Sequence, residues 1–218
     1  MNKMKSKYDL VVFDLDGTIA DSDLGLVKVG IKMSETFLPR KDINMDDYLF
    51  LNGPTLDETM PYLFPGYDLD ELIKKYYEYL PDSIKDITMF KGAKELIKLL
   101  KKHDVDMALL TNRARASTEQ ILKRHGVFKC FKTLVCVDDG FKKKPSGEGL
   151  RHICQTLGHS PERTIFVGDN WRDILAGQDA GVDVAFIHQH RRPHRLDVSA
   201  KYVLDDISEV VEVLKNGK

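Results

Sequence analysis

The amino-acid sequence predicts an α/β fold, a doubly wound parallel sheet that carries a small inserted all-helical domain. Leu10–Phe13 is apolar, too short for a helix and rich in β-branched and aromatic residues, which indicates a strand buried on both faces. From about residue 92 onward, strand and helix patterns alternate with short loops, as in doubly wound sheets. Between residues 20 and 87 only helical patterns occur. We therefore expect an α/β core from 1–20 and 87–218, and a separate helical domain from 21–86.

The inserted segment contains several apolar stripes at helical spacing. A first helix is predicted from Asp21 or Ser22 to about Phe37, because Pro39 then stops it. Three shorter helices are predicted at 46–51, 56–64 and 69–80. The separators are the pairs at 53–54 and 65–66 and the single Pro81.

The remaining core elements follow in a regular order. Strands are predicted at 105–110, 133–137, 164–167, 184–187 and 202–204. Helices are predicted at 92–102, 117–126, 147–157, 171–180 and 207–214. Ser117 and Gln120 have the spacing of a capping box, so we expect the second of these helices to begin at Ser117.

Composition excludes several classes of protein. The chain has 218 residues, 42% of them hydrophobic and 31% charged, with a formal net charge of −1, so no basic excess indicates nucleic-acid binding. No apolar run is long enough to span a bilayer. Cys130, Cys136 and Cys154 form no Cys-x-x-Cys pair and fit the reduced core of a cytoplasmic protein. Neither a Gly-x-Gly-x-x-Gly fingerprint nor a Walker-type loop is present, which disfavours a nucleotide-dependent enzyme.

Polar side chains gather where the predicted strands end. Asp14 and Asp16 follow the first strand at once, and ligands of parallel sheets bind beyond the carboxyl ends of strands. Two carboxylates this close repel, so one would take up a proton unless a cation joined them. Later strands and loops add further candidates: Thr111, Asn112, Lys144, Asp169 and Asp173.

These residues fall into four motifs in a fixed order: Asp14-Leu15-Asp16-Gly17-Thr18, Thr111-Asn112, Lys144-Pro145 and Gly168-Asp169-Asn170-x-x-Asp173. The set resembles the haloacid dehalogenase superfamily, in its phosphoglycolate phosphatase-like branch with a helical cap. The resemblance covers nearly the whole chain and implies a Rossmann-like core with residues 21–86 as the cap. Taken singly, each motif has a plainer explanation, such as a solvated basic loop around Lys144 or acids that favour a helix N-terminus.

The resemblance also implies roles. Asp14 would be the nucleophile that forms an aspartyl-phosphate, and Asp16 would be the general acid and base. Thr111 and the backbone of Asn112 would hold the phosphoryl oxygens, and Lys144 would offset negative charge. The implied cofactor is Mg²⁺. Its ligands would be Asp14, the backbone carbonyl of Asp16 and Asp169, while Asp173 would face the ion or orient its waters.

Besides Asn112, substrate contacts are predicted at Thr18, at Arg113 and in the segment 52–56. Thr18 supplies a hydroxyl beside the first motif, and Arg113 would meet a substrate anion or form a surface salt bridge. The segment Asn52-Gly53-Pro54-Thr55-Leu56 resembles a cap loop that reaches the active site, which makes Gly53 and Thr55 candidates; a plain helix start is the alternative.

The predicted function is magnesium-dependent hydrolysis of small phosphate monoesters, phosphoglycolate-like or nucleotide-like. A sugar-phosphate mutase similar to β-phosphoglucomutase is the alternative, and a non-catalytic binding protein is a third hypothesis. The expected partner is a small phosphorylated metabolite, with no nucleic acid and no membrane, for a cytoplasmic monomer or homodimer. The loop 188–195 contains His188, His190 and His194 in a spacing that fits no zinc site, so we interpret it as a solvated polar loop.

Overall fold

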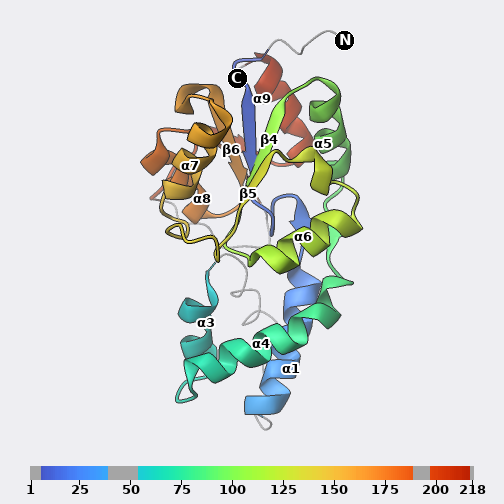
Figure 1. Cartoon of the computed structure of the whole chain (residues 1–218), viewed down its shortest axis with the longest axis vertical. Coiled ribbons are helices and arrows are strands. Elements are labelled where there is room, and N and C mark those ends of the chain that lie inside the picture. The colour runs from blue at the N-terminus through green and yellow to red at the C-terminus, as the bar shows by residue number, and fades with distance from the viewer. Residues whose placement is uncertain (1–5, 39–53, 189–196, 217–218) are drawn as a thin grey trace. The chain divides into compact units, whose positions relative to one another are not determined.

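The computed structural model describes residues 6–38, 54–188 and 197–216, and the chain divides into two compact units (Figure 1). Unit 1 comprises Met1–Ala20 and Met89–Lys218, and unit 2 comprises Asp21–Thr88. The two connecting segments, β2 (Ala20–Asp21) and β3 (Thr88–Met89), pair with each other as a short two-stranded sheet. Among the described residues, none of the helices combines the length and the hydropathy that a bilayer crossing requires.

Unit 1 is built on a six-stranded parallel sheet in the order β5-β4-β1-β6-β7-β8. The strands are β1 (Leu10–Phe13), β4 (Asp106–Leu110), β5 (Thr133–Val135), β6 (Thr164–Gly168), β7 (Asp183–Ile187) and β8 (Tyr202–Leu204). β1 lies near the middle, and all four of its residues are buried. The fold class predicted from the sequence is confirmed.

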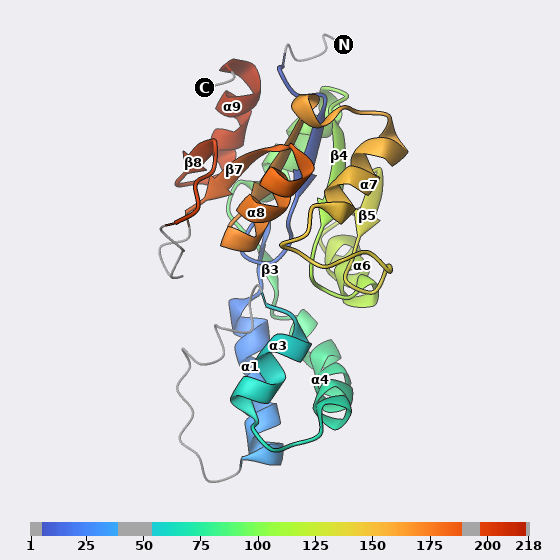
Figure 2. The same ribbon diagram turned by 90° about the vertical axis from the view of Figure 1, so that its left-hand side faces the viewer.

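Helices cover both faces of this sheet (Figures 1 and 2). They are α5 (Ala93–Lys102), α6 (Arg115–Arg124), α7 (Glu148–Leu157), α8 (Trp171–Ala180) and α9 (Val210–Asn216), with 3₁₀ turns at Phe128–Cys130, Pro161–Arg163 and Ile207–Glu209. α7 and α8 lie on one face, where Leu10 and Val12 of β1 pack with Phe166 and Ile174. Residues that alternate along a strand point to opposite faces, so Val11 and Phe13 point to the other face. Both faces of β1 are therefore core, as its unbroken apolar run predicts.

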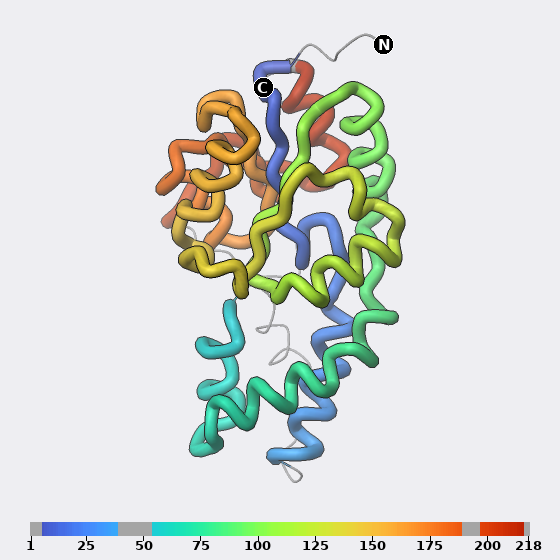
Figure 3. The backbone as a smooth tube through the Cα atoms, in the orientation of Figure 1, coloured from blue at the N-terminus to red at the C-terminus, as the bar shows by residue number. Residues whose placement is uncertain are grey.

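Unit 2 contains α1 (Asp23–Phe37), α3 (Leu56–Leu63) and α4 (Leu69–Ile84). α1 packs along α4, which the backbone trace in Figure 3 shows within this unit. Their buried residues include Leu26, Met33, Leu72 and Leu80. An added Cβ at Gly25 of α1 would lie 3.0 Å from both Ile87 Cγ1 and Ser83 O, so a side chain there would require its neighbours to shift. Glycine at this position therefore allows α1 to approach Ser83 of α4 closely.

Three predicted element boundaries need comment. Pro81 does not end its helix, because α4 continues to Ile84 and buries Leu80, Ser83 and Ile84. That packing outweighs the backbone hydrogen bond that proline removes. The helix predicted at 46–51 lies outside the described residues.

The capping box predicted at Ser117 is wrong. α6 begins at Arg115, and Ser117 lies inside it with its hydroxyl donating to Ala114 O. The Arg115 N–H instead donates to Asp138 Oδ1 at 2.8 Å. A carboxylate from a distant loop therefore satisfies the first N–H of the helix, a contact that local sequence cannot reveal.

Candidate active site

The candidate residues follow three neighbouring strands. β1 is hydrogen-bonded to both β4 and β6, with Phe13 opposite Leu109 and Val167. Asp14, Thr111 and Asp169 each come directly after the last residue of one of these strands. Parallel strands bring their carboxyl ends to one edge, so this register places the three residues side by side. A hydrogen bond from Asp14 N to Val167 O, 2.9 Å long, extends the β1–β6 ladder up to the site.

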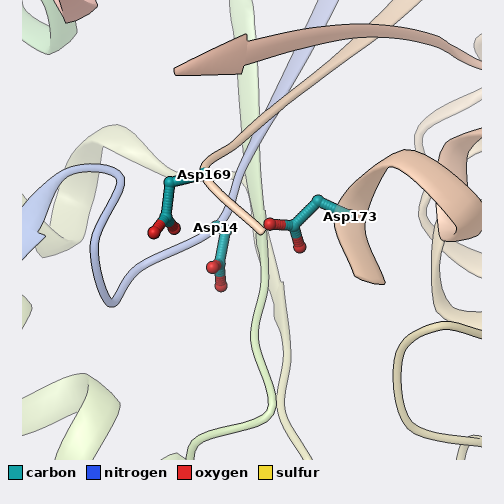
Figure 4. Close-up of side chains that lie close together, drawn as sticks. All are labelled: Asp14, Asp169 and Asp173. Atoms are coloured by element: carbon teal, nitrogen blue, oxygen red, sulfur yellow. The ribbon is translucent and has the colours of Figure 1, made fainter. Parts of the chain in front are cut away.

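Three carboxylates converge at this edge. Asp14, Asp169 and Asp173 each place an oxygen within 4.8 Å of the others, and all three residues are buried. Figure 4 shows Asp14 between the other two, with Asp173 approaching from the first turn of α8. Gly168 makes this approach possible, because an added Cβ would lie 2.5 Å from the Asp173 side chain.

Lys144 joins two of these carboxylates. Its Nζ lies 2.8 Å from Asp14 Oδ1 and 2.7 Å from Asp173 Oδ1, and only 4% of its side chain is exposed. Asn112 holds the lysine in place through its side-chain amide, which accepts from Lys144 N at 3.0 Å and donates to Lys144 O at 3.3 Å. Sequence reasoning gave Asn112 only a backbone role. Asn side chains often form hydrogen bonds with backbone groups, and this tendency is the signal that could have indicated the contact between the Asn112 amide and the Lys144 backbone.

Thr18 is completely buried, and its hydroxyl donates to Asp169 Oδ1 at 3.0 Å. A tight loop positions it, in which Gly17 has φ +85° and Ala20 N donates to Leu15 O at 2.9 Å. Only glycine adopts such a φ without strain. The predicted substrate contact of Thr18 is untested, and its observed partner is the carboxylate of Asp169.

The Arg113 guanidinium forms a bidentate contact with the Asp16 carboxylate. Nε lies 2.8 Å from Asp16 Oδ2, and Nη2 lies 2.7 Å from Oδ1. The two side chains are 6% and 14% exposed, so the pair is largely shielded from solvent and is not the surface salt bridge considered from the sequence. Thr111, itself buried, accepts from Arg113 N through its hydroxyl at 3.2 Å. The Arg113–Asp16 contact thus joins the segment after β4 to the first motif, whereas the Thr111 contact is local.

The site has an excess of negative charge. If all four carboxylates are counted as ionised, they outnumber the cations Lys144 and Arg113 by two, which gives a formal charge of −2. Burial raises the pKa of Asp14 well above its ordinary value, and repulsion from Asp173 and Asp169 adds to this, although Lys144 opposes it. Burial alone would lower the pKa of Lys144, yet attraction to Asp14 and Asp173 raises it, so the lysine stays charged.

The donor set fits a magnesium ion. Mg²⁺ prefers oxygen ligands, and the three carboxylates offer oxygen atoms that all lie within 4.8 Å of one another, so an ion between them could reach more than one of them. A divalent cation would cancel the charge of −2 and favour the ionised form of Asp14. Both oxygens of Asp173 already accept hydrogen bonds, from Lys144 Nζ and from Asn170 N at 2.9 Å. This favours Asp14 and Asp169 as ligands and an orienting role for Asp173.

The contacts described above involve none of the remaining predicted residues. Thr55 belongs to unit 2, where it precedes α3 and its N–H donates to Glu58 Oε2 at 2.9 Å. Gly53 and the histidines at 190 and 194 lie outside the described residues. His188 stacks on Phe186, with a distance of 6.4 Å between ring centroids.

Comparisons with known proteins identify the family of this chain. The family model of haloacid dehalogenase-like hydrolases matches residues 11–187. Pyrophosphatase PpaX of Bacillus cereus (strain AH820) is 28% identical over 213 residues, covering 96% of this chain and 98% of that protein. A haloacid dehalogenase-like family hydrolase of Streptococcus pneumoniae has the same fold, with a TM-score of 0.83, 19% identity and coverage of 94% and 98% of the two chains. A predicted phosphoglycolate phosphatase of Haemophilus somnus 129pt gives a TM-score of 0.81 at 19% identity, covering 95% and 98%. The chain belongs to the haloacid dehalogenase-like hydrolases.

Proposed function

We propose that this enzyme is a magnesium-dependent phosphatase that acts on small phosphorylated compounds through a phosphorylated Asp14. The observation that carries the proposal is the buried Asp14 carboxylate, clustered with Asp169 and Asp173 and bonded to Lys144. A structural ion pair would need one carboxylate for one lysine. Three buried acids that lie together, two of them bonded to the same lysine, are costly for folding, and such a cluster is typical of a functional site.

The first step transfers the phosphoryl group. An oxygen of Asp14 attacks phosphorus while the bond to the leaving oxygen breaks, and Asp16 gives its proton to that oxygen. Lys144 stays beside Asp14 and balances part of the negative charge. In the second step Asp16 takes a proton from a water molecule, whose oxygen attacks phosphorus and frees the Asp14 carboxylate. The products are the alcohol and inorganic phosphate.

Asp14, Asp169 and the backbone carbonyl of Asp16 would hold Mg²⁺, which when bound supplies positive charge that offsets the repulsion between carboxylate and phosphate. Thr18 would keep the Asp169 carboxylate oriented through its hydrogen bond of 3.0 Å. Asp173 would do the same for Lys144.

We further propose that unit 2 is a cap that selects the substrate, with Gly53 and Thr55 as contacts. Its position in the chain supports this, because it is inserted directly after the first motif. Two substrate classes are candidates. Phosphate monoesters such as phosphoglycolate or nucleoside monophosphates follow from the motifs, and inorganic pyrophosphate is favoured by the likeness to PpaX over 96% of the chain.

Phosphate release from p-nitrophenyl phosphate, phosphoglycolate, nucleoside monophosphates and pyrophosphate, with and without Mg²⁺, tests the proposal. We expect turnover that requires Mg²⁺ and is lost in Asp14→Asn, together with a phosphorylated Asp14 peptide in acid-quenched wild-type enzyme. Asp205→Asn, which alters an exposed carboxylate of unit 1, is the matched control and should stay active. An active Asp14→Asn enzyme would remove Asp14 from its role. Conversion of glucose 1-phosphate to another sugar phosphate would favour the mutase.

A further inference from the structure

Arg113 is more closely bound to Asp16 than a charge pair requires. Nε also lies 3.1 Å from Oδ1, in addition to the contacts at 2.8 Å and 2.7 Å, so the planar guanidinium faces both carboxylate oxygens. Arginine alone offers donors in such a rigid fork. Because both oxygens are held, the carboxylate can neither rotate nor swing without breaking a contact.

The backbone on each side of the pair is fixed as well. Arg113 N donates to Thr111 Oγ1 at 3.2 Å, and Arg113 O accepts from Val137 N at 3.3 Å. On the other side, Asp16 forms a β-bridge with Ala20. The pair therefore connects two rigid loops that lie 97 residues apart in the sequence.

Stability alone does not account for this pair. A buried ion pair loses hydration on both partners, and apolar residues of similar size often stabilise a protein equally well. The pair also fixes the orientation of the Asp16 carboxyl group, and proton transfer requires a fixed orientation. A general acid must lie within hydrogen-bond reach of the leaving oxygen, and small displacements lower the rate strongly.

We infer that Arg113 is a positioning residue that aims the Asp16 carboxyl group at the leaving oxygen; this rests on the proposed function. When Asp16 is protonated on Oδ2, Nη2 still donates to Oδ1 and keeps the group in place. As the bond between phosphorus and the leaving oxygen breaks, the proton passes from Oδ2 to that oxygen. The resulting Asp16 carboxylate then accepts hydrogen bonds from both Nε and Nη2 of Arg113 until it takes a proton from the attacking water. In this arrangement Arg113 acts on the reaction through Asp16.

Leaving-group dependence tests this inference, measured as kcat/KM because that constant covers the steps up to release of the leaving group. Nitrophenolate leaves without a proton, whereas an alkoxide needs one. For Arg113→Met we expect p-nitrophenyl phosphate hydrolysis within about 3-fold of wild type and a loss of about 100-fold with propyl phosphate, since general acid catalysis contributes about 10²-fold or more. Arg113→Lys, which keeps one donor, should lose about 10-fold with propyl phosphate only, and it provides the test if the methionine variant does not fold.

Two further variants sharpen the result. Asp16→Asn should show the same leaving-group dependence, and adding Arg113→Met to it should cause no further loss, because both changes remove one function. Arg115→Met is the matched control: Arg115 binds Asp139 in the same two-pronged way, through Nε at 2.8 Å and Nη2 at 2.6 Å, and should leave the ratio of the two substrates unchanged.

Equal losses with both substrates in Arg113→Met or Arg113→Lys would overturn the inference, as would additive losses in the double variant. Wild-type enzyme without any phosphatase activity would overturn the proposed function and this inference together. Active wild type with substrate-independent losses would overturn this inference alone.

Discussion

Replacing Lys144 with Met should destabilise the metal-free protein severely. The change removes the positive charge that lies 2.8 Å from Asp14 and 2.7 Å from Asp173, whose side chains are 8% and 0% exposed. Removing one partner of a buried ion pair costs about 3 to 5 kcal/mol, because the remaining charge stays buried. For a domain of about 150 residues this corresponds to a fall in Tm of about 6 to 20 °C.

The effect should depend on pH in a defined direction. The pKa of Asp14 is raised in the folded protein, so the folded state binds this proton more tightly than the unfolded state does. Stability therefore falls as pH rises from about 4 through the raised value. Loss of Lys144 removes an influence that lowers this pKa, so the fall becomes larger. The difference between variant and wild type should be greatest near about pH 7 and should shrink towards about pH 4.

Thermal unfolding followed by circular dichroism in EDTA measures both effects. Lys123→Met is the matched control, because its Nζ lies 2.6 Å from Glu119 on an exposed helix face and should change Tm by no more than about 2 °C. Adding Asp173→Asn to Lys144→Met should recover part of the loss, because it removes one of the unpartnered charges. An unchanged Tm at neutral pH, or a difference that grows as pH falls, would refute the reasoning.

Three other predictions concern the same site. Adding Mg²⁺ to the wild-type protein should raise Tm more at neutral pH than near about pH 5, because the ion competes with the proton that the raised pKa of Asp14 retains; equal shifts in scanning calorimetry would contradict this. Thr18→Val should lower Mg²⁺ affinity about 10-fold in titration calorimetry while Thr18→Ser keeps it, because the hydroxyl orients Asp169; equal affinities of the two variants would argue against this role. Gly168→Ala should cost about 2 kcal/mol in urea unfolding, because the new Cβ would lie 2.5 Å from the Asp173 side chain, and full stability would show that Asp173 moves without penalty.

The sheet could be predicted from the sequence because its signal is local. The apolar run of β1 and the alternation after residue 92 need only hydrophobic patterning, and the observed sheet follows them. Boundaries that depend on distant partners could not be predicted. α6 begins at Arg115 because Asp138 caps it, and α4 continues past Pro81 because the next turn is buried. Patterning therefore identifies elements, and tertiary contacts decide where they end.

The same distinction holds for the site. Sequence placed the motifs at strand ends, and strand register brings Asp14 and Asp169 together there. The contacts between motifs needed the structure. The Asn112 amide on the Lys144 backbone and the Arg113 fork on Asp16 each join segments at least 32 residues apart, and neither residue type indicates its partner.

Under the proposed function, these contacts would give two acids that are two residues apart different roles. Asp14 lies in a group of buried carboxylates with Lys144 on one of its oxygens. Asp16 is turned to Arg113, which binds both of its oxygens. A nucleophile needs one oxygen exposed to phosphorus, whereas a proton carrier needs a fixed direction. Two cations from different motifs thus give the two carboxylates different environments, which is how enzymes assign separate roles to paired acids. The difference between Asp14 and Asp16 therefore depends on which cation binds each of them, and not on the carboxylates alone.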